Sequence, residues 1–291
     1  MAFNYPLLAQ SGGSVFPPKT ILGVNQYIQS PNGRYRLLNQ PDLNLALYDG
    51  PSAIWVADKH SPNSDEFYPK VWKKDDASQV YMNHVLGLMD LDRRRIWHTV
   101  NTDIPYGGSQ ENAAGRTYLQ LQDDGNMVII DAFPLWEITA SVSIKPQSNA
   151  SIIKPGTILN PGDTFKAGKS RLVFQGDGNL VFYGENDRVI WASYTQNKGA
   201  AFAAMQTDGN FVIYSTDRKP LWHTGTDGHP EAYARVQEDG SFSIVMDRVC
   251  WARFGFTPTV KPIRVYYPNH ADPIEQGTDP FPTYGHIGFE F

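Results

Sequence analysis

Five side chains that suit hydrogen bonding to a small polyol recur at two-residue intervals in the second half of the chain. In a β-strand, residues two apart point to the same side of the sheet. A carboxylate accepts hydrogen bonds, whereas amides and phenols both donate and accept them, as sugar hydroxyls do. The pattern Q-x-D-x-N-x-V-x-Y occurs twice in full, and its members are Gln175, Asp177, Asn179, Val181 and Tyr183, then Gln206, Asp208, Asn210, Val212 and Tyr214. Each row predicts a small binding site on one face of a sheet.

Both copies belong to a longer repeated unit that ends on an apolar residue followed by tryptophan. Gln175, Gln206 and Gln237 are each 31 residues apart. Six units in two groups of three account for six of the seven tryptophans. A fixed period with a fixed aromatic residue is typical of repeat architectures. The unit ends are Ile54-Trp55, Ile96-Trp97, Leu135-Trp136, Ile190-Trp191, Leu221-Trp222 and Cys250-Trp251.

Each unit predicts a short β-meander, in which an Asp-Gly turn joins the strand before the Gln to the strand Asn-x-Val-x-Tyr. The hairpin places the Gln beside the Asn and Tyr, with the Asp at the turn. Three such sheets packed around one axis can share a core filled by their three tryptophans. Because no segment shows helical periodicity, we predict an all-β fold.

The other units preserve the motif unevenly. One N-terminal unit keeps the polar set, although Ala46 replaces the Val, and it is a weaker candidate site formed by Gln40, Asp42, Asn44 and Tyr48. The next copy loses the Tyr to Ile130 and keeps Gln122, Asp124, Asn126 and Val128. The last copy keeps Gln237 and Asp239, followed by Ser241 and Ser243, and the unit at 85–99 keeps only apolar alternation. Alternating polar residues also occur on ordinary solvated strand faces, and that interpretation suits these degraded copies better than the two intact ones.

Length and composition agree with two domains. We predict an N-terminal domain at 1–143 with an insertion near 60–80, a C-terminal domain at 144–256, and an extension at 257–291. The net charge of −5 argues against nucleic acid as a partner. No apolar stretch approaches the roughly 20 residues that span a membrane. The single Cys250 excludes an intramolecular disulfide, and as a buried small hydrophobe it suits the core.

The double motif resembles the signature of the monocot mannose-binding, or bulb-type, lectins over residues 15–255. That resemblance implies two tandem β-prism domains, each with three four-stranded sheets around a pseudo-threefold axis. It assigns Asp177 and Asn179 to the 2-hydroxyl of a mannose-type sugar, and the Gln, Tyr and Val to the 3-hydroxyl, the 4-hydroxyl and the ring C–H groups. Asp208 and its neighbours repeat these roles. Nothing in the motif contacts the 6-position, so D-mannose and its 6-deoxy analogue D-rhamnose fit equally.

Two tandem domains without a disulfide pair or a recognisable signal peptide resemble the lectin-like bacteriocins of the putidacin and L-type pyocin kind. The resemblance implies a protein made in the cytoplasm, released, and acting on the surface of related bacteria. Its partners would be a mannose- or D-rhamnose-containing polysaccharide, such as a lipopolysaccharide O-antigen, and an outer-membrane barrel-assembly protein of the target cell. The alternative is a non-toxic mannose-binding agglutinin or defence lectin. We expect a monomer of two domains.

Enzyme activity is not expected. The seven histidines are scattered without metal-ligand spacing, and most acidic residues fall in turns or in the sugar motif. We therefore predict no catalytic residue, metal or cofactor.

Overall fold

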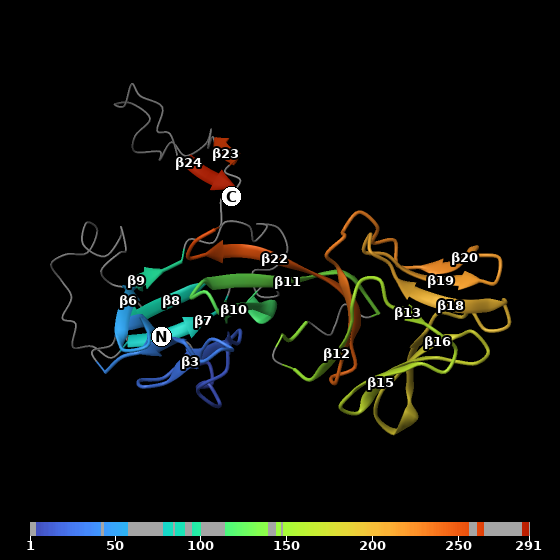
Figure 1. Cartoon of the computed structure of the whole chain (residues 1–291), viewed down its shortest axis with the longest axis horizontal. Helices are drawn as coiled ribbons and strands as arrows, with labels where there is room; N and C mark the ends of the chain where they lie inside the picture. The colour runs from blue at the N-terminus through green and yellow to red at the C-terminus, as the bar shows by residue number, and fades with distance from the viewer. Residues whose placement is uncertain are drawn as a thin grey trace, which may run out of the picture.

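The computed structural model describes residues 4–41, 44–57, 78–83, 85–90, 95–99, 114–138, 144–146, 148–255, 261–264 and 287–290. These ranges are almost entirely β-structure, arranged in two lobes (Figure 1). The predicted insertion near 60–80 lies outside them except for its last residues, which begin β7 (Ser78–Met82). In the extension, β23 (Lys261–Arg264) pairs with β24 (Ile287–Glu290).

Each lobe holds two four-stranded antiparallel sheets of its own. Those of the N-terminal lobe are β3 (Tyr27–Gln29), β4 (Tyr35–Asn39), β5 (Leu45–Asp49) and β6 (Ser52–Val56), and β2 (Thr20–Leu22), β7, β8 (Leu86–Asp90) and β9 (Arg95–His98). Those of the C-terminal lobe are β14 (Thr164–Ala167), β15 (Ser170–Phe174), β16 (Leu180–Tyr183) and β17 (Val189–Ala192), and β13 (Ile158–Leu159), β18 (Ala200–Met205), β19 (Phe211–Ser215) and β20 (Pro220–His223).

A six-stranded sheet joins the two lobes, because β11 (Met127–Glu137) and β22 (Phe242–Ala252) run through both of them (Figure 1). Its order is β1-β10-β11-β22-β21-β12. The third sheet of the N-terminal lobe therefore consists of β1 (Val15–Phe16), β10 (Thr117–Leu121) and one half each of β11 and β22. The other halves complete the C-terminal lobe with β21 (Tyr233–Gln237) and β12 (Ala150–Ile153). Each lobe thus has three four-stranded sheets, and the predicted β-prism fold is confirmed.

The long strands exchange tryptophans between the lobes. Trp136, at the end of β11, has its ring centroid 5.6 Å from those of both Trp191 and Trp222 in the C-terminal lobe. Trp251, on β22, packs instead against the core of the N-terminal lobe together with Trp55. The prediction that each domain fills its core with its own three tryptophans is therefore wrong. The boundary at 143/144 stays a prediction for the two groups of repeats. It does not separate the lobes, because each lobe includes half of a strand from the other group.

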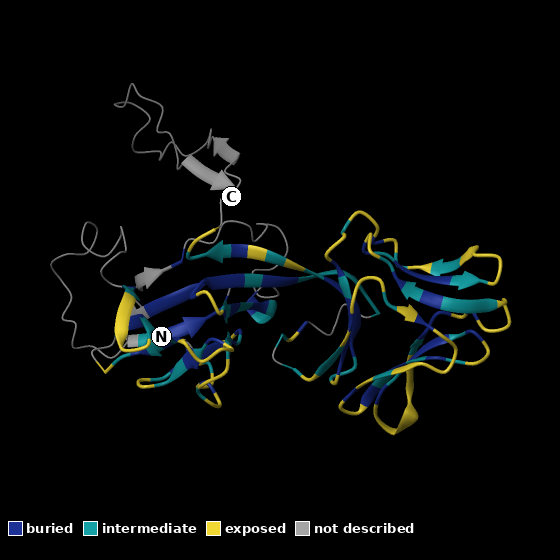
Figure 2. Ribbon diagram, in the orientation of Figure 1, coloured by how far each residue is buried: buried dark blue, intermediate teal, exposed yellow. Residues whose placement is uncertain are grey.

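The two largest hydrophobic cores of the described residues lie inside the lobes, one in each, and exposed residues gather at the turns (Figure 2). Inward-pointing positions alternate along the strands, as β15 illustrates with Ser170, Leu172 and Phe174 buried and the residues between them partly exposed. Cys250 is fully buried in the N-terminal core, as expected of a small hydrophobe. The remaining outward row of each hairpin carries the polar motif.

Candidate sugar-binding sites

The first intact copy is built around the tight turn between β15 and β16. Gln175 N–H donates to the Asn179 carbonyl at 2.8 Å, and Gly178 N–H donates to the Gln175 carbonyl at 3.0 Å. Gly178 has φ +85°, and a Cβ there would lie 2.7 Å from the Cβ of Ala200, so only glycine fits. Asp177 Oδ1 accepts the Asn179 N–H at 3.0 Å. The turn therefore holds an exposed carboxylate next to the Asn side chain.

A Gln–Tyr hydrogen bond connects the two ends of each motif. Gln175 Nε2 donates to Tyr183 Oη at 2.8 Å, and Gln206 Nε2 donates to Tyr214 Oη at 3.0 Å. An amide that donates through nitrogen keeps its oxygen as an acceptor, and a phenol that accepts keeps its O–H as a donor. Each pair can therefore offer one acceptor and one donor to a hydroxylated ligand.

The Asn side chain of each intact copy is held by the segment that follows the repeat tryptophan. Asn179 Oδ1 accepts from Ser193 Oγ at 3.1 Å and from Thr195 N–H at 3.2 Å. In the second copy, Asn210 Oδ1 accepts from Thr224 Oγ1 at 3.0 Å and from Thr226 N–H at 3.3 Å. Because the oxygen is engaged, the amide N–H₂ is the group that remains to donate to a ligand beside the carboxylate.

The Ser/Thr-x-Thr segments after the tryptophan were missed in the sequence. Their signal is nevertheless visible, because Trp191 is followed by Ala-Ser-Tyr-Thr and Trp222 by His-Thr-Gly-Thr. Thr195 and Thr226 also bind the turn glycines, because their Oγ1 hydroxyls donate to the Gly178 and Gly209 carbonyls at 2.7 Å. Trp136 and Trp251 are not followed by such a segment.

The valines form the floor of the intact sites. Val181 is 3% exposed and Val212 is 2% exposed, although both belong to the outward row. Val181 pairs with Val173 on one side and Ala192 on the other, so small apolar side chains surround it. An apolar floor within a ring of donors and acceptors suits the C–H face of a sugar ring.

The weaker N-terminal candidate shares the Gln–Tyr arrangement. Gln40 Nε2 donates to Tyr48 Oη, and Gln40 N–H donates to the Asn44 carbonyl at 2.8 Å. Asp42 lies outside the described residues, so the complete set Gln40, Asp42, Asn44 and Tyr48 stays a prediction.

The copy at 122–130 uses its amide within the protein. Asp124 Oδ1 accepts the Asn126 N–H at 2.8 Å, which reproduces the turn of the intact copies. Asn126 Nδ2, however, donates to the Phe254 carbonyl at 3.0 Å, while its Oδ1 accepts the Phe254 N–H at 3.2 Å. Since both ends of the amide are bonded and Ile130 replaces the Tyr, this geometry favours a scaffold role.

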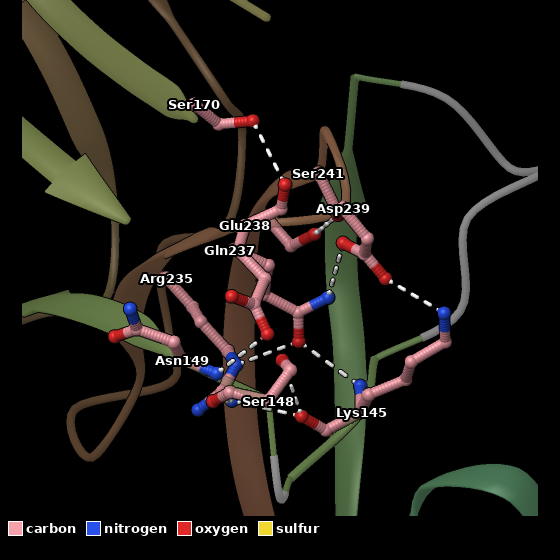
Figure 3. Close-up of polar contacts among 10 residues, drawn as sticks. Lys145, Ser148, Asn149, Ser170, Arg235, Gln237, Glu238, Asp239 and Ser241 are labelled. Carbon is pink, nitrogen blue, oxygen red and sulfur yellow. Dashed lines mark hydrogen bonds and ion pairs between the residues drawn. The ribbon is translucent and has the colours of Figure 1, made fainter. Parts of the chain in front are cut away.

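The last copy is closed by the segment that connects the repeat groups (Figure 3). Gln237 is fully buried, and its Oε1 accepts from Lys145 N–H at 2.9 Å and Arg235 Nε at 2.7 Å. Its Nε2 donates to Asp239 Oδ1 at 3.2 Å, and Asp239 Oδ2 pairs with Lys145 Nζ at 3.0 Å. The two surviving motif side chains therefore bind the connecting segment, which favours a structural role here too.

Arg235 gives a first testable prediction. Its Nη2 donates to the carbonyls of Lys145 at 2.9 Å and of Pro146 and Ser148 at 3.4 Å, and the side chain is buried. Arg235→Ala should lower the free energy of unfolding by about 2–3 kcal/mol, because the buried Gln237 Oε1 and three partly buried carbonyls lose a charged donor. Chemical denaturation measures this loss. Glycan binding at the intact copies should stay unchanged below the melting temperature, and a binding loss without destabilisation would contradict the structural role.

The described ranges of the chain contain no helix with the length and apolar character of a bilayer-spanning segment. They also contain no group of three or more His, Cys, Asp or Glu residues placed to hold a metal ion.

Comparisons with known proteins point to one group of lectins. No protein-family model matches the sequence, and no curated protein matches it. Among solved structures, the two-domain fetuin-binding agglutinin of Scilla campanulata is 18% identical, covers 80% of this chain and 93% of its own, and has a TM-score of 0.45. The mannose-specific agglutinin of snowdrop (Galanthus nivalis) bulbs, solved with methyl-α-D-mannoside, is 32% identical over 38% of this chain and 98% of its own, with a TM-score of 0.31. The Polygonatum cyrtonema lectin, solved with a monomannoside, is 28% identical over 37% of this chain and 97% of its own, with a TM-score of 0.30. The solved structures that resemble this chain are thus mannose-binding lectins and agglutinins of the monocot bulb type, and two of these three were solved with a mannoside.

Proposed function

We propose that this protein binds mannose-type glycans through the two intact copies in its C-terminal lobe. The observation that carries the proposal is the recurrence of one hydrogen-bonding arrangement at both copies, described above for Gln175–Tyr183 and Gln206–Tyr214. Solvent exposure of a strand face does not explain why the same five side chains and supporting contacts occur at two places.

Each site is expected to be weak on its own. A hydrogen bond that replaces a bond to water contributes only about 0.5–1.5 kcal/mol. A shallow site of this kind should bind a monosaccharide near 1 mM, or about −4 kcal/mol. The two sites lie on different sheets of one lobe, so a polymer that engages both gains affinity through effective concentration. The natural ligand is thus a polysaccharide that carries mannose or D-rhamnose.

We further propose that glycan binding serves a bacteriocin. The observation that favours it is a difference between the lobes. Both intact sites lie in the C-terminal lobe, whereas the Asn126 amide of the N-terminal lobe is hydrogen-bonded to the Phe254 backbone. The tandem layout and the extension at 257–291 support the same function. The second contact would be an outer-membrane barrel-assembly protein of the target cell, reached after release from the producer and docking on a polysaccharide such as an O-antigen.

A spot test on a panel of related Gram-negative strains separates the two functions. A bacteriocin should inhibit growth of strains whose surface carries mannose or D-rhamnose, and a variant without intact sites should inhibit less. The same preparation is titrated with mannan and with a D-rhamnose polysaccharide as a control for binding. Intact binding without inhibition of any strain would support a non-toxic agglutinin instead.

A further inference from the structure

The sheet face of the first intact copy continues beyond its tyrosine into a row of cationic side chains. Lys166 on β14 pairs with Arg171 on β15, and Arg171 pairs with Tyr183 on β16. Residues directly opposite one another in antiparallel strands lie on the same face of the sheet. Lys166 and Arg171 therefore share the face that carries Gln175, Val181 and Tyr183.

Arg171 is in direct contact with the sugar motif. Its guanidinium carbon lies 4.4 Å from the centroid of the Tyr183 ring. Beyond this contact lies a hollow of about 480 Å³ lined by Thr164, Lys166, Gly168, Lys169, Ser170, Arg171 and Asp187. Three cations and one carboxylate line this hollow, and one of the cations, Arg171, also contacts the tyrosine of the first site.

The cations of this hollow are available to a ligand. Lys166 is exposed and forms no ion pair within the part of the chain that the structure describes. Lys169 pairs with Glu185, and Arg171 pairs with Asp187, whose side chain is 78% exposed. Solvent-exposed ion pairs contribute only about 0–1 kcal/mol, so an anionic ligand can replace the carboxylates at little cost.

The second intact copy has a different surface at the same place. Phe202 pairs with Tyr214 there, at the position that Arg171 occupies opposite Tyr183. The Phe202 and Tyr214 rings stack with centroids 5.2 Å apart and an interplanar angle of 24°. Ile158, opposite Ala204 on the neighbouring strand, is 60% exposed. The two sites share a motif but have a cationic and an apolar border, respectively.

We propose that the first intact site binds two neighbouring parts of a glycan. A mannose-type residue occupies the motif, and an anionic group on the same polymer, a phosphate or a carboxylate, occupies the hollow formed by Lys166, Lys169 and Arg171. Guanidinium and ammonium groups bind both anions through charge-assisted hydrogen bonds. The Phe202-bordered site has no such preference. This inference rests on the proposed lectin function and narrows the preferred ligand of the first intact site to acidic, mannose-type polysaccharides.

The test compares three polymers by calorimetric titration of the full-length chain. They are a neutral α-mannan, the same mannan carrying mannosyl phosphate groups, and one carrying glucuronic acid groups. The protein carries Asp208→Ala and Gln40→Ala, so that the Gln175 site is the complete candidate that remains. At low salt we expect an anionic polymer to bind about tenfold more tightly than the neutral one, and this preference should shrink with added salt.

Two charge variants make the experiment specific. Lys166→Gln combined with Lys169→Gln should abolish the anionic preference and leave the affinity for neutral mannan unchanged. Lys154→Gln removes one charge from an exposed turn outside the hollow and should preserve the preference. Tighter binding of only the phosphorylated or only the uronate polymer identifies which anion the hollow accepts. Equal binding of all three polymers, or a preference that survives the double substitution, would overturn the inference, whereas failure to bind even neutral mannan would contradict the lectin function itself.

Discussion

Asp177→Ala combined with Asp208→Ala should lower the affinity for a mannan by at least about 100-fold while the protein stays folded. A hydrogen bond to a charged group contributes about 1.5–3 kcal/mol, which corresponds to roughly 10–100-fold at each site. Both carboxylates are exposed at turns, and each accepts only a local backbone N–H, from Asn179 and Asn210 respectively. Calorimetric titration measures the affinity, and thermal unfolding checks that the fold is retained.

Asp124→Ala is the matched control for this pair. Asp124 accepts the Asn126 N–H at 2.8 Å at an equivalent Asp-Gly turn, yet Asn126 has its amide engaged by Phe254. The substitution therefore removes the same turn bond without touching an intact site, and mannan binding should be unchanged. Asp177→Asn with Asp208→Asn keeps the turn acceptor and removes only the charge. Undiminished binding in the double Ala variant would show that the glycan binds elsewhere.

Trp136→Ala should destabilise the C-terminal lobe, although the residue belongs to the first group of repeats. Its ring packs edge-on at 5.6 Å against Trp191, Trp222 and Phe242. Truncation of a buried aromatic side chain to Ala typically costs about 3–5 kcal/mol through lost contacts and the cavity left behind. Because Trp136 is partly buried against the core, we expect a loss near the lower end of that range. Because both intact sites lie in this lobe, glycan binding should disappear at a lower temperature than in the parent protein. Differential scanning calorimetry with and without mannan records both effects.

Trp251→Ala is the reciprocal experiment. Trp251 packs against the core of the N-terminal lobe, so its loss should destabilise that lobe and spare the mannan-dependent transition. A separately expressed fragment 144–256 should likewise fail to fold as a monomer, because it lacks the half of β11 that carries Trp136. If Trp136→Ala left the mannan-dependent transition unchanged, the exchange of tryptophans between the lobes would be contradicted.

The exchange of tryptophans between the lobes has a physical cause in the number of residues between the Gln and the Trp of each unit. From Gln175 to Trp191 and from Gln206 to Trp222 the spacing is 16 residues, whereas from Gln122 to Trp136 and from Gln237 to Trp251 it is 14. The longer units contain a polar turn that folds the chain back, as at 185–187 before β17. The shorter units lack the residues for that turn, so the strand continues straight for 11 residues, or about 36 Å at 3.3 Å per residue. Its second half then reaches the other lobe.

The motif side chains of the degraded copies are bound by residues that are distant from them in sequence. Gln237 and Asp239 were recognised as remnants of a motif, but Lys145 engages them only after β21 and the connecting segment come together. Likewise, Asn126 is separated from Phe254 by 128 residues. No local pattern reports such a partner, because alternation describes the face of a strand and not what covers it.

The sequence by itself determined the β-meander, the face on which Gln175 and its companions lie, and the ranking of intact and degraded copies. These properties follow from the two-residue period of a strand and from turn chemistry, both of which act over a few residues. Only the tertiary structure decided which lobe receives Trp136 and Trp251, and which side chains border Tyr183 and Tyr214. Those outcomes depend on how the long strands pair across the two lobes and on cross-strand register, and each brings together residues from separate strands.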